Sequence, residues 1–157
     1  MFKVSTKFSN NLSLCIAVVF LVGCIAAAFL MPTVTNMLID TPDNIGDRGS
    51  ITDGGRVFVH IMAYVLLLVV ALSDVLSIRL LLRVRKGDVF TEKSVSLIRG
   101  VSWCCILLCL SFALLGIYFQ LALIMAFLAL FLGICLRVVK NVIEEATLIK
   151  SENDLTV

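Results

Sequence analysis

Residues that carry out most enzyme chemistry are scarce in this sequence. It contains one histidine, His60, with no nucleophile or second metal ligand beside it. The motifs G-x-S-x-G, H-E-x-x-H, S-x-x-K and the phosphate-binding P-loop are missing, as is the D-x-[DN]-x-[DN]-G calcium loop. We therefore expect no enzyme activity, no catalytic or metal-binding residues and no cofactor.

The cysteine patterns of a zinc site or a disulfide framework are missing too. All six cysteines fall within apolar segments, none forms a C-x-x-C pair, and no histidine is nearby to complete a zinc site. We expect free thiols that pack as small apolar residues. They are Cys15, Cys24, Cys104, Cys105, Cys109 and Cys135.

Charge is also sparse. Only 15% of the 157 residues are charged, 61% are hydrophobic, and the mean hydropathy is +1.09. Soluble domains are about 45–50% apolar, and about 20 apolar residues cross a bilayer. The chain, residues 1–157, is therefore predicted to be one all-α domain, an integral membrane four-helix bundle. The predicted elements are helices at 12–30, 57–86, 92–117 and 121–150, an outer loop at 31–56 and a cytoplasmic hinge at 79–99.

Two processing signals compete with an uncleaved first helix. Leu21-Val22-Gly23-Cys24 matches a lipoprotein cleavage box, which would make Cys24 a lipid anchor, and the small residues 26–28 fit a secretory signal. Both would leave a polar mature start. Because residues 25–31 stay apolar and carry the segment to spanning length, an uncleaved helix is the favoured interpretation.

The hinge has the signals of a tight turn between two helices. The apolar segment that begins at Val57 continues without a helix breaker to Lys86, and Gly87 suits the left-handed position after a helix end. Thr91 is predicted to cap the next helix, with Glu92 in its first turn.

Two short strings resemble a known family. Arg85-Lys86-Gly87-Asp88-Val89-Phe90-Thr91-Glu92, followed by an apolar helix, and the end of the chain, Glu152-Asn153-Asp154-Leu155-Thr156-Val157, are similar to the YoaS-like family. This is a group of small bacterial four-helix membrane proteins, a domain of unknown function (DUF 2975). The resemblance implies that fold, no established activity, no family site residues, and a gene often encoded beside a small helix-turn-helix regulator.

Stripes of small residues predict how the last two helices pack. A very short turn near residues 118–120 makes these helices antiparallel neighbours. In lipid, small residues let helix backbones approach closely. The two stripes are Ser102, Cys105, Cys109, Ala113 and Gly116, and Ala122, Ala126, Ala129 and Gly133.

Two ionisable residues lie within or beside the apolar segments. Asp74 is seventeen residues beyond the outer start of its helix at Val57, and Arg137 is sixteen residues beyond Leu121. At about 1.5 Å per residue, both lie about 25 Å down. One interpretation is a structural ion pair between Asp74 and Arg137. The other is a functional site at Asp74, because intramembrane ionisable residues commonly mark function.

Three hinge cations recur at helical spacing: Arg79, Arg83 and Lys86. They are predicted to form a patch that attracts anionic lipid headgroups with about 1 kcal/mol per residue. The alternative is that they only fix the orientation of the protein.

Two function classes follow. In the first, the protein is a regulatory or scaffolding partner that presents a basic cytosolic hinge and a helical tail. Its expected partners are the lipid bilayer and either a cytoplasmic DNA-binding regulator or another membrane subunit. Direct nucleic-acid binding is not expected, because the basic residues cluster at membrane edges. In the second, it is a small transporter or channel subunit with Asp74 in a polar path. Against the second, no predicted helix is interrupted by proline or paired glycines.

The charge distribution predicts topology. Lys and Arg concentrate in cytoplasmic loops, so both termini and the hinge should lie in the cytoplasm and the protein should be a multi-pass protein of the bacterial inner membrane. A reporter active only in the cytosol should be inactive when fused after Asp47, and activity there would contradict this topology. The cytoplasmic set is Lys3, Lys7, the six basic residues of 79–99, Arg137, Lys140 and Lys150, against Arg48 and Arg56 outside.

Overall fold

The chain folds into four long helices. The computed structural model describes residues 6–40, 52–86 and 91–155, and within these ranges it contains no strand. The helices are α1 (Thr6–Asp40), α2 (Asp53–Lys86), α3 (Glu92–Leu115) and α4 (Gln120–Leu155). Each is long and apolar enough to cross a membrane. The predicted all-α fold with four spanning helices is confirmed.

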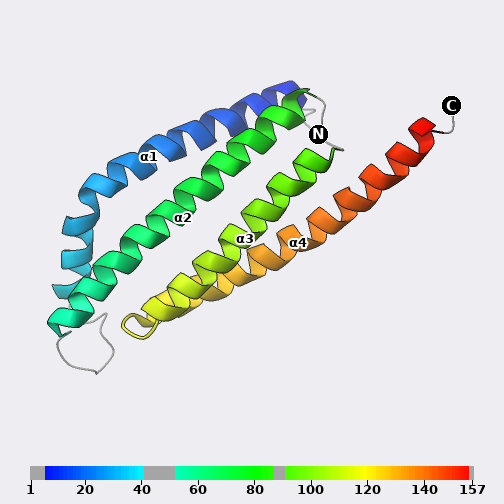
Figure 1. The fold of residues 1–157 in the computed structure, drawn as a ribbon. Helices are drawn as coiled ribbons and strands as arrows, with labels where there is room; N and C mark the ends of the chain where they lie inside the picture. The colour runs from blue at the N-terminus through cyan, green and yellow to red at the C-terminus, as the bar shows by residue number, and fades with distance from the viewer. Residues whose placement is uncertain (1–5, 41–51, 87–90, 156–157) are drawn as a thin grey trace, which may run out of the picture.

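The helices pack in chain order. α1 packs on α2, α2 on α3 and α3 on α4, and each helix runs antiparallel to the one before it (Figure 1). The end of α2, the start of α3 and the end of α4 therefore lie toward the same end of the molecule. We call this the hinge end.

α1 is much longer than predicted. The sequence predicts a helix at 12–30 and an outer loop at 31–56, but α1 continues to Asp40 and α2 begins at Asp53. Pro32, which the prediction placed in the outer loop, lies inside α1 without interrupting it. A proline ring removes one backbone hydrogen bond and displaces the preceding turn, which bends a helix without ending it. Figure 1 shows α1 bending in its second half.

Local contacts hold the segment after the bend in a helix. The Thr35 hydroxyl donates to the carbonyl oxygens of Met31 at 2.8 Å and Pro32 at 3.1 Å. Thr35 is buried. An ion pair of 3.2 Å joins Asp40 at the end of α1 to Arg56 in the first turn of α2. Residues 41–51 of the predicted outer loop lie outside the described ranges.

The helix ends on both sides of the hinge lie at the predicted residues. α2 ends at Lys86 and α3 begins at Glu92. Thr91 is extended (φ −137°, ψ 148°), and its side chain accepts a hydrogen bond from the Ser94 backbone N–H at 3.4 Å, as expected of an N-cap. Gly87, the predicted helix-ending glycine, lies outside the described ranges.

Small residues bring α3 and α4 together, as the stripes predict. The Ser102 hydroxyl, on a side chain that is only 3% exposed, donates to the Gly133 carbonyl oxygen at 3.0 Å. A β-carbon added at Gly133 would lie 3.2 Å from the β-carbon of Cys105. The helix bounds differ slightly from the predicted 92–117 and 121–150, because α3 ends at Leu115 and α4 continues to Leu155.

The outward surfaces are apolar. Phe29 is 82% exposed and Phe127 is 70% exposed, and many other large apolar side chains of the four helices are exposed as well. Soluble monomers rarely expose apolar surface on this scale, whereas lipid tails cover it readily. All six cysteines are free thiols, and Cys24 and Cys104 are buried.

Gly133 and Gly23 offer a matched test of the α3–α4 contact. The substitution Gly133→Val places methyl groups against Cys105, whereas a β-carbon at Gly23 would meet nothing within 4 Å. Overpacking of this kind costs about 1–3 kcal/mol. We expect Gly133→Val to lower the thermal unfolding temperature in detergent, and Gly23→Val to leave it nearly unchanged. Equal effects of the two substitutions would contradict this account of the packing.

Candidate anion-binding site

A groove lined by basic residues lies between the last turns of α2 and the first turns of α3. Its volume is about 560 Å³. Four cationic side chains line it, together with one hydroxyl and two leucines. We call it the basic groove, and its residues are Arg79, Leu82, Arg83 and Lys86 of α2 and Lys93, Ser96 and Leu97 of α3.

The helical repeat places the predicted patch in this groove. Arg79, Arg83 and Lys86 are spaced by four and three residues, so they share one face of α2. The structure brings all three to the same groove. The sequence reasoning missed the contribution of α3, which supplies Lys93 and Ser96 from across the hinge.

The register of the hairpin explains the position of Lys93. A β-carbon added at Gly100 would lie 3.1 Å from Leu76 Cδ1, so these two residues face each other across α2 and α3. Counting seven residues from this contact toward the hinge on both helices brings Lys93 level with Arg83. The sequence showed that a short link joins two antiparallel helices. It did not show which residues of α2 and α3 lie opposite each other, because this alignment depends on the contact between Gly100 and Leu76.

None of the four cations of the basic groove forms an ion pair with a carboxylate within the described ranges. Glu92 and Glu144 line a separate hollow between α3 and α4 instead. Among the described residues, no carboxylate compensates the positive charge of the groove. Backbone N–H groups at the start of α3 add to it, because a helix N-terminus favours anions.

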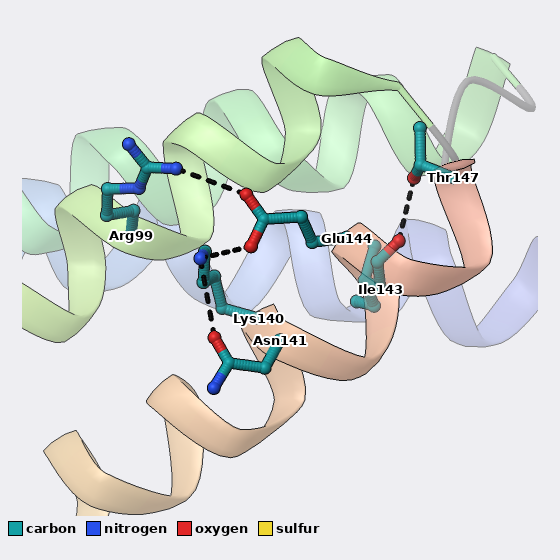
Figure 2. A network of polar contacts seen from close by, with 6 residues as sticks. All are labelled: Arg99, Lys140, Asn141, Ile143, Glu144 and Thr147. Carbon is teal, nitrogen blue, oxygen red and sulfur yellow. Dashed lines mark hydrogen bonds and ion pairs between the residues drawn. The ribbon is translucent and has the colours of Figure 1, made fainter.

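Cations that are paired with a carboxylate lie on the other side of α3, in the network of Figure 2. Glu144 of α4 accepts from Arg99 of α3 at 3.4 Å and also forms an ion pair with Lys140 one turn earlier. Lys140 donates to the Asn141 side-chain oxygen at 3.3 Å as well. This network ties the last part of α4 to α3. Exposed pairs of this kind contribute only about 0–1 kcal/mol each.

The structure does not bring Asp74 and Arg137 together. Asp74 lies near Cys24 of α1, close enough for an electrostatic interaction. Arg137 is exposed, and its guanidinium lies over the Trp103 ring, 5.3 Å from the ring centroid. The predicted ion pair is therefore not formed. The prediction rested on the equal depth of the two residues in the membrane. In the structure, α3 packs between α2, which carries Asp74, and α4, which carries Arg137, and keeps these two helices apart.

Asp74 is left with an unsatisfied oxygen. Its Oδ2 atom is buried and has no hydrogen-bond partner among the described residues. The neighbouring Ser77 hydroxyl donates to the Ser73 carbonyl oxygen at 2.9 Å. Buried polar groups are nearly always paired, so this oxygen marks Asp74 as a second position of functional interest.

The described residues contain no group of three histidine, cysteine or acidic side chains that could hold a metal ion. The lone histidine, His60, makes a local contact near the start of α2. Its Nδ1 atom donates to the Arg56 carbonyl oxygen at 2.8 Å.

Four helices that are each long and apolar enough to cross a membrane define the class of a multi-pass membrane protein. A sequence profile of the family described as proteins of unknown function (DUF2975) matches residues 47–157. The chain belongs to this family, and the match covers the hinge, Asp74 and the whole basic groove. No curated protein and no solved structure is detectably similar to the chain.

Proposed function

We propose that the protein is a regulatory or scaffolding partner in the bacterial inner membrane, and that its basic groove binds anionic phosphate groups on the cytosolic side. The observation that carries this proposal is the facing arrangement of Arg79, Arg83 and Lys86 with Lys93, without a carboxylate among the described residues to neutralise them. The excess of Lys and Arg at the hinge end supports a cytosolic position for it.

The level of the groove supports lipid headgroups as its ligands. Arg79 directly follows the apolar segment 57–78, so the groove begins where the hydrocarbon core ends. The cytosolic leaflet carries anionic lipids, and each basic residue near its surface contributes about 1 kcal/mol of attraction.

The end of α4 supports a role in contacting a second protein. Beyond Arg137 the helix continues to Leu155, and in this part Val142 and Leu148 are about 60% exposed although they are large apolar residues. Exposed apolar residues on a helix outside the hydrocarbon core are typical of interaction surfaces. In this proposal α4 presents them to a cytoplasmic DNA-binding regulator, the kind of neighbour that the family resemblance implies, or to another membrane subunit.

Lipid-dependent stability tests the groove. Phosphatidylglycerol should raise the thermal unfolding temperature of the wild type more than phosphatidylcholine does. The double variant Arg79→Gln/Arg83→Gln should lose much of this difference, because two groove cations contribute about 2 kcal/mol. The matched control Arg85→Gln/Arg137→Gln removes two cations near the same end that do not line the groove, and it should keep most of the difference. Equal loss in both double variants would contradict the proposal.

A small transporter or channel subunit is the second candidate. The buried, unpartnered Oδ2 atom of Asp74 favours it, because an intramembrane carboxylate can carry a proton or bind a cation. Against it, the described helices pack as consecutive neighbours, and Asp74 lies beside α1 rather than opposite a second charged residue.

Ion leakage from proteoliposomes separates the two candidates. We expect vesicles containing the wild-type protein to hold a proton gradient as long as empty vesicles do. Asp74→Asn should behave like the wild type, as should the control Asp53→Asn at the exposed start of α2. The outcome that would favour a transporter or channel subunit over a scaffolding partner is a proton leak in the wild type that is lost in Asp74→Asn and kept in Asp53→Asn.

A further inference from the structure

The cations of the basic groove lie at two levels along the hairpin. The Gly100–Leu76 contact fixes the register of α3 against α2. From this register, Arg79 is level with Leu97 and close to Ser96, whereas Arg83 is level with Lys93, and Lys86 lies one turn further from the membrane. At a rise of about 1.5 Å per residue, Arg79 and Arg83 are separated by about 6 Å along α2, and Arg79 and Lys86 by about 10 Å.

Each level offers donors for one phosphate group. The upper level has the Arg79 guanidinium, which suits the geometry of a phosphate, and the Ser96 hydroxyl beside it. The lower level has Arg83, Lys86 and Lys93 from both helices. A single phosphodiester carries one negative charge and reaches one level only, so it leaves the cations of the other level uncompensated.

A lipid with two phosphodiesters would occupy both levels with one molecule. Once the first phosphate is bound, the second phosphate of the same molecule binds without a further loss of translational freedom, which strengthens the overall affinity. Leu82 and Leu97 line the groove beside the cations. They give it an apolar surface that the glycerol backbone and acyl chains of a lipid can contact. Basic pockets between spanning helices on the cytoplasmic side commonly bind headgroups of this kind.

The position of the groove favours a lipid over a soluble acidic ligand. The headgroup zone adds about 5–7 Å to each side of the hydrocarbon core. The groove begins at Arg79, immediately after the apolar segment, and its cations extend about 10 Å from there. Most of its charge therefore lies at headgroup level.

We infer that the basic groove is a binding site for a lipid with two phosphodiester groups, of the cardiolipin class, held by Arg79 at one phosphate and by Arg83, Lys86 and Lys93 at the other. This inference rests on the proposed function, because it requires that the hinge end faces an anionic leaflet.

Lipid binding to the full-length, delipidated protein in detergent tests the inference, with native mass spectrometry as the readout. Cardiolipin and phosphatidylglycerol are compared at equal phosphate concentration. We expect the wild type to bind cardiolipin about ten-fold more tightly than phosphatidylglycerol. The double variant Arg83→Gln/Lys93→Gln removes the lower level, so its affinity for cardiolipin should fall to that for phosphatidylglycerol.

Two control variants accompany this comparison. Arg85→Gln/Arg137→Gln removes two cations outside the groove and should keep the preference for cardiolipin. Arg83→Lys/Lys93→Arg keeps both charges and should also keep it. Circular dichroism and gel filtration establish that each variant is folded, so that a lost preference reports on binding.

The outcomes separate this inference from the proposed function. Equal affinity of the wild type for the two anionic lipids would overturn the two-phosphate site and leave the anionic-lipid proposal intact. No preference of either lipid over phosphatidylcholine would overturn both. Displacement of cardiolipin by an equal concentration of inorganic pyrophosphate would overturn the assignment to a lipid, because a soluble diphosphate would then suffice.

Discussion

Close approach of backbones at small residues is the constraint on which the arrangement of the helices depends. Lipid tails are as apolar as leucine, so burial of apolar area gives spanning helices little reason to associate. The hydrogen bond from Ser102 to the Gly133 carbonyl oxygen and the contact of Gly100 with Leu76 show two places where helices meet closely. The first fixes α4 on α3, and the second fixes the register of α3 on α2. The alignment of Lys93 with Arg83 in the basic groove follows from the second contact.

The two faces of α3 at the hinge end differ in how their charge is balanced. On the face toward α4, the single carboxylate of Glu144 forms ion pairs with both Arg99 and Lys140. On the face toward α2, the groove cations have no carboxylate among the described residues to pair with. The first arrangement links α4 to α3 through Arg99. The second is the feature on which the proposed binding of anionic groups rests.

Features that depend on local sequence were predicted well. The apolar segments gave the four helices, Thr91 was identified as the cap of α3, and the small stripes gave the α3–α4 contact. Features that depend on the neighbours of a helix were not. Pro32 was placed in the outer loop, but α1 continues through it, and the contacts of Thr35 and Asp40 hold the continuation. Asp74 and Arg137 were matched by depth alone, and depth does not say which helix lies between them. Lys93 joins the groove through a register that the sequence does not specify.

The length of α4 leaves its two ends attached to α3 in different ways. α4 is one unbroken helix of 36 residues, or about 54 Å, and its hydrogen bond to α3 lies at Gly133. About 33 Å of helix extends from Gly133 toward Leu155 and about 20 Å toward Gln120. The shorter part begins at the tight turn, where the Leu115 carbonyl oxygen accepts from the Tyr118 and Phe119 N–H groups. In the longer part, the exposed Arg99–Glu144 ion pair links α4 to α3 about half-way between Gly133 and Leu155. Because an exposed pair contributes only about 0–1 kcal/mol, the end of α4 is the part of this helix that a binding partner could displace at the lowest cost.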